Sequence, residues 1–165
     1  MHSSYMIHRD MKLENIMVEI KPCQKEDSCS NITCKITDFG FACMMEKNHK
    51  KKTLSIGSPL YMAPDVLSHM YDYKADIWSI GVITYMLLTG EPPFQGKDND
   101  ETFTKIRYFP YNKECLEVYT KEGKYVLDFL SKCLNRNQNQ RATADELLSH
   151  KWFKKNVVSH EISDE

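Results

Sequence analysis

The sequence predicts a mainly α-helical fold with one short β-hairpin, and three observations indicate it. Residues 74–89 are apolar on all faces and stop at Gly90, which is typical of a helix surrounded by other protein. Residues 123–136 repeat apolar side chains at helical spacing. Residues 15–20 and 32–37 are short β-type runs separated by a polar loop that contains proline, so together they predict a hairpin.

The segments after the hairpin alternate between loops and short helices. Residues 41–58 show no helical or strand period, which predicts a surface loop. Residues 63–69 predict a short helix, because Pro64 falls in the first turn, where its missing N–H is harmless. After a predicted loop at 90–98, residues 100–109 predict another short helix.

The last predicted helix lies within residues 143–153. Thr143 followed three residues later by Glu146 matches a capping box, in which each residue's side chain binds the other's backbone N–H. Residues 154–165 are polar, and we expect a frayed tail there.

Length and composition predict one globular domain in a reducing compartment. The 165 residues are 41% hydrophobic and 27% charged, and 22 basic residues nearly balance 23 acidic ones. This balance predicts neither a nucleic-acid partner nor a membrane partner. The six cysteines form no CxxC pair and follow no secretory signal, so we expect a cytoplasmic protein with free thiols.

Four short motifs occur in an order and at spacings that are informative. The sequence HRD at 8–10 is followed by Asn15, then by DFG at 38–40 after the hairpin, and GSPLYMAPD at 57–65 closes the long loop. The order and spacing resemble the C-terminal lobe (C-lobe) of eukaryotic protein kinases over residues 1–153. A lysine two residues after the aspartate resembles the serine/threonine class.

The resemblance implies a site for ATP-dependent phosphate transfer, which depends on aiming the acceptor hydroxyl and neutralising the phosphate charge. Asp10 would be the base that accepts the hydroxyl proton, and Lys12 would approach the transferring phosphate of ATP. Asn15 and Asp38 would hold Mg²⁺ through their oxygen atoms. Met17 would lie beneath the adenine, although simple core packing explains it equally well.

Two further residues concern the protein substrate. A glutamate at the position of Glu14 pairs, in kinases that prefer basic substrates, with an arginine before the acceptor. An exposed glutamate without a role is the alternative. Ser58 keeps a hydroxyl where serine/threonine kinases usually carry threonine beside the catalytic aspartate.

Regulation by phosphorylation is a further expectation from the resemblance. Arg9 precedes the catalytic aspartate, as in kinases whose activation loop is ordered by a phosphate that pairs with this arginine. Thr53 and Ser55 are the candidate acceptors. Leu54 occupies the spacing from Gly57 that the family most often phosphorylates.

Three matched residues are expected to be structural. Asp76 resembles the buried aspartate that accepts hydrogen bonds from the HRD backbone. Asp65 stands where the family usually has glutamate, and Arg141 is its expected ion-pair partner. Because aspartate is one methylene shorter, a bidentate pair requires a small shift of the segment.

The extent of the match leaves two hypotheses for function. The insertion at 21–31, GEPPF and RATADELLSHKWF resemble the calcium/calmodulin-dependent and calcium-dependent kinases. Only seven residues precede His8, so the chain lacks the β-rich N-terminal lobe (N-lobe), which we expect in the full-length protein. The first hypothesis is a fragment of an active kinase whose substrate is a protein. The second is an inactive kinase-like lobe that serves as a protein-interaction module.

Overall fold

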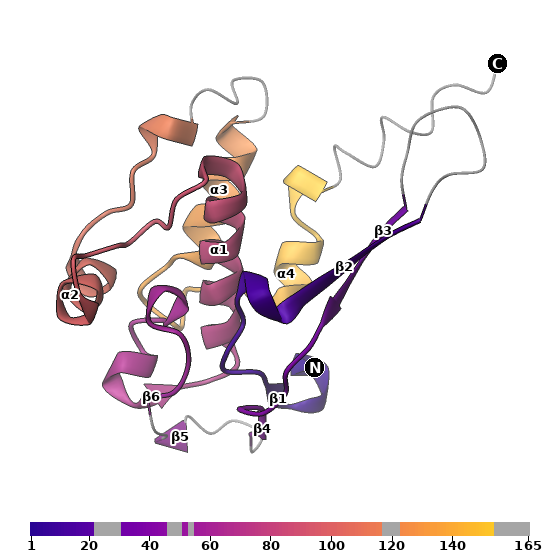
Figure 1. The fold of residues 1–165 in the computed structure, drawn as a ribbon, viewed down its shortest axis with the longest axis horizontal. Helices are drawn as coiled ribbons and strands as arrows, with labels where there is room; N and C mark the ends of the chain where they lie inside the picture. The colour runs from indigo at the N-terminus through magenta and orange to yellow at the C-terminus, as the bar shows by residue number, and fades with distance from the viewer. Residues whose placement is uncertain (22–30, 46–50, 53–54, 117–122, 154–165) are drawn as a thin grey trace.

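The computed structural model describes residues 1–21, 31–45, 51–52, 55–116 and 123–153. Helix α1 (Lys74–Thr89) runs through the centre, with α2 (Asn99–Tyr108) on one side and the hairpin of β2 (Ile16–Lys21) and β3 (Asn31–Ile36) on the other (Figure 1). Helices α3 (Gly123–Cys133) and α4 (Ala144–Leu148) pack near α1. The arrangement is mainly helical with a short hairpin, as the sequence predicted.

Helix α1 is the axis of the hydrophobic core, because its side chains meet protein on nearly every side. Ile77, Trp78 and Val82 are fully buried. A Cβ on Gly81 would lie 2.6 Å from the Cβ of Cys133, so the small residue lets α3 approach closely. Gly90 ends the helix in the left-handed conformation with φ 80°, as the sequence predicted.

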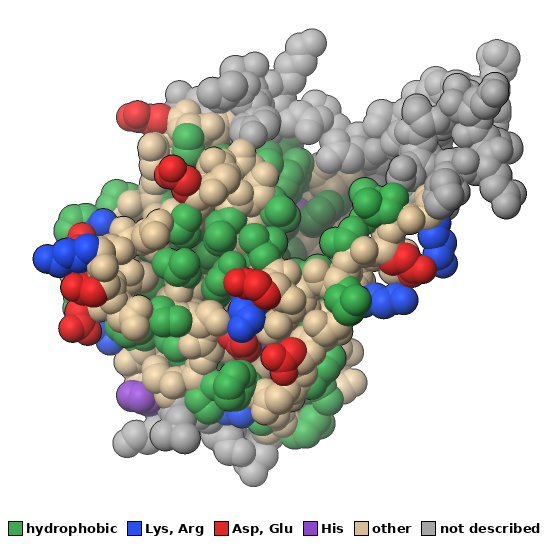
Figure 2. Space-filling view, viewed as in Figure 1, with side chains coloured by type: hydrophobic (Ala, Val, Ile, Leu, Met, Phe, Trp, Pro, Cys, Tyr) green, Lys and Arg blue, Asp and Glu red, His purple; other side chains and the backbone are tan. Residues whose placement is uncertain are grey.

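The hairpin has one apolar face and one polar face. The antiparallel register pairs Ile16 with Ile36, Val18 with Cys34, and Ile20 with Ile32, and alternation along the strands puts these six side chains on the same face. Val18, Ile20 and Ile32 are each more than half exposed. Apolar side chains gather along the hairpin and over α1 on the face turned to the viewer (Figure 2).

The long segment at 41–58 is not all loop. Strand β4 (Cys43–Met44) pairs with β1 (Met6–Ile7), and β5 (Lys51–Lys52) pairs with β6 (Met70–Tyr71). These two-residue strands depend on partners far away in sequence, so the local pattern did not reveal them.

The predicted helix at 63–69 is wrong. Only a single 3₁₀ turn forms, at Val66–Ser68, because His69 adopts the left-handed conformation with φ 58° and ends the turn. The chain then turns into β6, where Met70 donates its backbone N–H to the Asp65 carbonyl at 3.2 Å. Two further 3₁₀ turns lie in the segments that carry the motifs. Leu13–Asn15 follows HRD, and Pro59–Tyr61 lies inside GSPLYMAPD.

The predicted helices in the second half of the chain form with small shifts. Asp98, predicted to be in a loop, caps α2 by accepting the Glu101 N–H at 2.8 Å. The predicted capping box of Thr143 and Glu146 is present at α4. Helix α3 ends three residues earlier than the predicted 136, and residues 154–165 lie outside the described residues. Within the described part, no helix is long and apolar enough to span a bilayer.

Candidate active site

The segment 8–10 is held in place by one buried carboxylate. Asp76, on the first turn of α1, accepts the backbone N–H of His8 at 2.9 Å and that of Arg9 at 3.0 Å. His2 adds a third contact to the same carboxylate at 3.0 Å. These bonds satisfy a carboxylate that is only 2% exposed and would otherwise be costly to bury. The predicted contact between Asp76 and the HRD backbone is therefore present.

His8 locks the backbone next to Asp10. Its ring is fully buried, and Nε2 lies 3.0 Å from the carbonyl oxygen of Thr37. Because a carbonyl only accepts, Nε2 carries the proton and Nδ1 is free to accept the Asp10 N–H at 3.3 Å. The His8 ring also packs against Phe39 at 5.1 Å between ring centres. His8 thus connects HRD to DFG.

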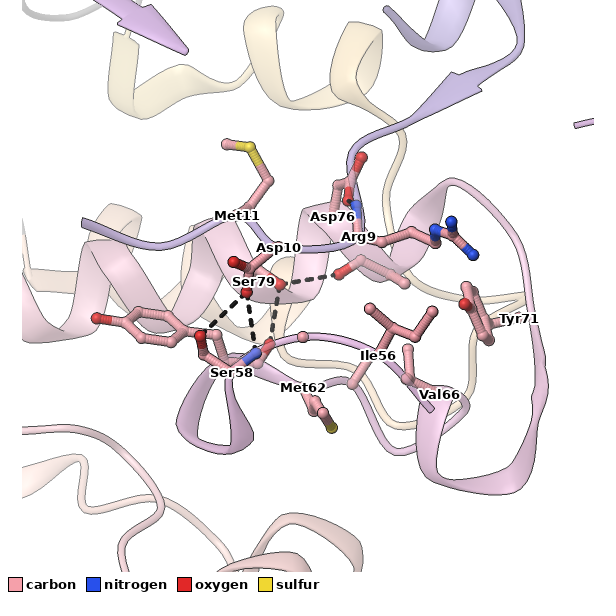
Figure 3. A pocket seen from close by; sticks show the side chains of 14 residues that line it. Arg9, Asp10, Met11, Ile56, Ser58, Met62, Val66, Tyr71, Asp76 and Ser79 are labelled. Carbon is pink, nitrogen blue, oxygen red and sulfur yellow. Dashed lines mark hydrogen bonds between the residues drawn. The ribbon is translucent and has the colours of Figure 1, made fainter. Parts of the chain in front are cut away.

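Asp10 is held at both of its carboxylate oxygens. Oδ1 accepts the Ser58 backbone N–H at 2.9 Å and its hydroxyl at 3.0 Å, and Oδ2 lies 2.9 Å from Lys12 Nζ. Burial alone would raise the pKa of Asp10, but the hydrogen bonds from Lys12 and Ser58 together bring it below its usual value. Asp10 and Ser58 face each other directly in Figure 3. The carboxylate is therefore charged and fixed at neutral pH.

The space beneath Asp10 is filled. The cavity bounded by Ile56, Val66, Tyr71 and neighbouring residues measures about 10 Å³, room for about one water molecule (Figure 3). Gly57 makes this close packing possible, because a Cβ there would lie 2.6 Å from the Arg9 carbonyl oxygen. The site therefore opens outward, where Lys12 and Asp38 lie.

Lys12 lies between Asp10 and the solvent. The hydrogen bond from its ammonium group to Asp10 raises the pKa of Lys12, and the charges of Asp10, Glu14 and Asp38 act in the same direction. Its Nζ is also 3.4 Å from the Ser58 hydroxyl. A firmly protonated lysine next to the carboxylate gives the site one fixed positive charge.

Asn15 and the segment before Asp38 are joined through the backbone. Asn15 is buried and donates its Nδ2 hydrogens to the backbone carbonyl of Asp10 at 2.9 Å and to Asp10 Oδ2 at 3.4 Å, so these bonds do not use its own Oδ1. The Asn15 carbonyl accepts the Thr37 N–H at 2.9 Å, so the residue before Asp38 is tied to Asn15. Asp38 itself has a left-handed φ of 59° and is exposed.

This donor set fits a hard cation. Mg²⁺ in phosphate-transfer sites usually takes one or two protein oxygens and completes its shell with phosphate and water. Among the described residues, no group of three or more His, Cys, Asp or Glu side chains is arranged to bind a metal without such outside ligands. Two oxygen-bearing side chains at the mouth of the site suit a metal that arrives with a phosphate.

Glu14 and Met17 lie at the surface. Glu14 is exposed on the 3₁₀ turn after Lys12, and its side chain reaches the Tyr61 hydroxyl. Burial first, and then the negative charge of Glu14, raise the pKa of Tyr61. Met17 is 63% exposed, so among the described residues it is not a core side chain. Simple core packing therefore does not explain Met17.

Two of the candidate regulatory residues, Arg9 and Ser55, each bind a backbone carbonyl. Arg9 donates from Nε to the Phe41 carbonyl, and its backbone has a left-handed φ of 71°. Ser55 donates its hydroxyl to the Val66 carbonyl at 3.1 Å. Thr53 lies outside the described residues.

Asp65 and Arg141 form the predicted ion pair. Arg141 Nη1 lies 3.3 Å from Asp65 Oδ2, and Nη2 contacts Oδ1, so the pair is bidentate despite the short aspartate side chain. Arg141 also donates to the carbonyls of Lys74 and Asn135, and its guanidinium lies 5.2 Å from the Trp78 ring centre. The pair thus connects the segment after Ser58 to α1.

Comparison with known proteins identifies the family. The family described as protein kinase domain matches residues 1–153. The chain belongs to the protein kinase family. Calcium-dependent protein kinases 5 and 4 of Plasmodium falciparum are 38% and 40% identical to it over 156 and 154 residues, in each case 93% of the chain. Calcium-dependent protein kinase 3 of Plasmodium berghei is 34% identical over 162 residues, or 98% of the chain.

The chain spans only 26%, 28% and 28% of the lengths of these three relatives. Membership of the family implies ATP, typically with Mg²⁺, and a protein substrate.

Sequence reasoning missed two histidines of this kinase site. His8 was read only as part of a motif, although its position directly before Arg9 and Asp10 was a usable signal. His2 gave no such signal, because its partner Asp76 lies 74 residues away. Its contact depends on the tertiary fold.

Proposed function

We propose that residues 1–153 form the C-lobe of a protein serine/threonine kinase, which transfers the γ-phosphate of ATP to a serine or threonine hydroxyl of a protein. The observation that supports this most directly is the Asp10 carboxylate, held charged between Ser58 and Lys12. A fixed carboxylate beside a fixed ammonium group suits a reaction that depends on positioning and charge rather than on covalent help from protein.

In this proposal Asp10 receives the acceptor hydroxyl. The hydroxyl donates to the carboxylate, which orients its oxygen and accepts its proton as the bond to phosphorus forms. Ser58 keeps the carboxylate from rotating, because it binds Oδ1 through both its N–H and its hydroxyl. Lys12 sits where negative charge on a phosphate oxygen would be stabilised.

Asn15 and Asp38 would hold the metal. Two observations support this: Asn15 is bonded through its side-chain amide to Asp10, and the charge of Asp38 acts on Lys12. Bound Mg²⁺ supplies positive charge to the phosphate oxygens of ATP. Met17, exposed on the strand that leaves this site, is the proposed contact for the adenine ring. The β-rich N-lobe that covers ATP in the family would come from another part of the polypeptide.

Glu14 is the proposed contact for a basic substrate. Its carboxylate is exposed beside Tyr61, on the turn that follows Ser58, so a peptide aimed at Asp10 would pass it. An arginine before the acceptor would find an accessible negative charge there. The cytoplasmic location and regulation through Arg9, Thr53 and Ser55 remain predictions from the sequence.

The proposal is tested by substrate preference as well as by transfer. With residues 1–153 placed in a complete kinase domain and a serine peptide that carries an upstream arginine, Glu14→Gln should raise KM about tenfold and leave kcat nearly unchanged, as expected when a binding contact is lost. Glu19→Gln, an exposed glutamate on the hairpin, is the matched control. Equal KM values for the two variants would contradict the role of Glu14.

A further inference from the structure

A groove lies between α3 and the segment that contains α4 (Figure 1). It encloses about 560 Å³, which is within the range of pockets that hold small ligands. Lys124 and Lys132 of α3 line one wall, and Lys151, which follows α4, lines the other. The catalytic site uses none of the residues that line this groove.

The wall formed by α3 carries two cations, of which one is already paired. Lys124, Asp128 and Lys132 are spaced four residues apart, so their side chains lie on the same face of the helix. Lys132 pairs with the Asp128 carboxylate. Among the described residues, no carboxylate pairs with Lys124, whose Nζ lies 5.1 Å from the ring centre of Tyr125. The Lys124 ammonium group is therefore available to a ligand.

A buried histidine fixes the opposite wall. His150 is 7% exposed, and its Nδ1 lies 3.2 Å from the backbone nitrogen of Trp152. Because a backbone N–H only donates, Nδ1 accepts, and Nε2 carries the hydrogen that binds Asp128 Oδ2 at 2.8 Å. The ring centres of His150 and Trp152 lie 5.5 Å and 5.0 Å from that of Phe129 on α3. Lys151, between these two anchored residues, is held beside α3.

Both carboxylates that line the groove are already engaged. Asp128 binds a lysine of its own wall and the histidine of the other, and these two hydrogen bonds lower the pKa of Asp128. Glu146 accepts the Thr143 N–H at 2.7 Å and the Thr143 hydroxyl at 3.1 Å, and these bonds lower the pKa of Glu146. Both carboxylates are therefore charged at neutral pH and bound to groups of the protein.

The charge that the groove offers to a ligand is positive. Its lining holds three lysines against two carboxylates, and His150 is neutral because its Nδ1 accepts a hydrogen bond. Lys151 is exposed and, like Lys124, pairs with no carboxylate in the part of the chain that the structure describes. The exposed Ser149 hydroxyl lies on the same lining and can donate a further hydrogen bond. Two ammonium groups and a hydroxyl favour an anion with several oxygen atoms.

We propose that this groove binds the phosphate group of a phosphoserine in a protein partner. Such a phosphate carries about two negative charges at neutral pH and presents three strong acceptor oxygens. Lys124 and Lys151 pair with these oxygens from the two walls, and the Ser149 hydroxyl donates to one of them. The groove is larger than a phosphate group, and the Tyr125 ring in its wall supplies a surface for the residues that flank the phosphoserine. Because the backbone of both walls is fixed beforehand, binding does not have to order it.

The test measures peptide binding to the 165-residue chain by fluorescence anisotropy at one fixed salt concentration. The probe is a short fluorescein-labelled peptide with one phosphoserine among glycines and alanines, and two further peptides carry serine or glutamate in its place. Lys124→Gln and Lys151→Gln should each weaken binding of the phosphoserine peptide about tenfold, because each removes a charge-assisted hydrogen bond. Lys97→Gln is the matched control, since it removes the same charge from an exposed lysine outside the groove and should leave the affinity unchanged.

Several results would overturn the proposal. These are no saturable binding of the phosphoserine peptide, equal affinity for the phosphoserine and glutamate peptides, or an equal loss of affinity in Lys97→Gln and Lys151→Gln. Competition with inorganic phosphate tests the other source of the same chemistry: if it displaces the peptide at a concentration close to the peptide's own Kd, the groove recognises free phosphate instead. Thermal melting of each variant shows whether the substitutions leave the chain folded. Binding needs neither ATP nor phosphate transfer, so its failure would leave the proposed kinase function untouched.

Discussion

At the scale of single residues, the site is built from side chains that hold the backbone of residues 8–10 through hydrogen bonds. The Asp76 carboxylate orients two backbone N–H groups, and His8 uses one ring nitrogen as donor and the other as acceptor. Asp10 is thereby presented by a backbone that has little freedom left. Such preorganisation is what phosphate transfer requires of a protein.

The lowered pKa of Asp10 predicts a specific dependence of stability on pH. The pairing with Lys12 and Ser58 outweighs the effect of burial, so the folded pKa lies below the unfolded value of about 3.9. The stabilisation is complete above the unfolded pKa and is lost as pH falls through the folded pKa. Between about pH 5 and pH 2, the wild-type chain should therefore lose more unfolding free energy than Asp10→Asn. Urea unfolding at several pH values measures the unfolding free energy of the wild-type chain and of Asp10→Asn. The same dependence on pH in the two proteins would contradict the pairing.

The buried ion pair predicts a large loss of stability. Arg141→Met leaves Asp65 without its partner, and because the Arg141 side chain is fully buried, the expected cost is about 3–5 kcal/mol. Arg107→Met is the matched control, since Arg107 is exposed and, among the described residues, donates to the Leu67 carbonyl alone. Denaturant unfolding measures both variants. A loss for Arg141→Met no larger than that for Arg107→Met would show that the pair is not structural.

At the scale of elements, side-chain caps mark the starts of α2 and α4. Thr143→Ala removes the acceptor for the Glu146 N–H and half of the capping box, so the expected cost is about 1 kcal/mol of unfolding free energy. Thr104→Ala provides the control, because Thr104 is exposed within α2 and its hydroxyl donates to the Asp100 carbonyl of the same helix. Urea unfolding should show the larger change in Thr143→Ala, and the reverse order would contradict the capping role.

Elements that depend on local pattern were predictable from the sequence, and those that depend on distant partners were not. Helix α1 has the predicted bounds, because apolar side chains on all faces and Gly90 carry the information within the segment. Strands β4 and β5 form only beside β1 and β6, so no local signal marks them. The turn at Val66–Ser68 was mistaken for a helix because the left-handed His69 has no signature in sequence.

The same distinction applies to the candidate site. Asp10, Lys12, Asn15 and Asp38 could be named because motif spacing marks them, and the fold brings them together. The contact of His2 with Asp76 was missed because it crosses 74 positions. That Arg9 and Ser55 would each bind a backbone carbonyl could not be foreseen, because such bonds depend on the local path of the chain.

At the scale of the whole molecule, the described residues leave a broad apolar surface. One of the six apolar side chains on the hairpin face, Ile36, also lines a cavity of about 370 Å³. Ile77 and Ile80 of α1 form part of the apolar wall of the same cavity. An isolated two-stranded hairpin is marginally stable in water and gains stability from packing against other elements. Additional protein packed on this surface would therefore stabilise the hairpin.

The proposed kinase activity is a property of the assembled catalytic domain, so its test must supply the rest of that domain. In a chimera, residues 1–153 replace the matched segment of Plasmodium falciparum calcium-dependent protein kinase 5, which is 38% identical to the chain. Thermal melting is measured for the chimera and for its Asp10→Asn variant, because a cooperative transition shows that each protein folds.

The decisive measurement is phosphate transfer by this chimera from ATP to a serine peptide in the presence of Mg²⁺ and Ca²⁺. We expect transfer that requires Mg²⁺ and falls by a factor of about 10² or more in Asp10→Asn, with unchanged melting, because the variant loses the group that receives the hydroxyl proton. A folded chimera that transfers no phosphate, or equal transfer by the two proteins, would contradict the assignment of Asp10 and the proposed function with it.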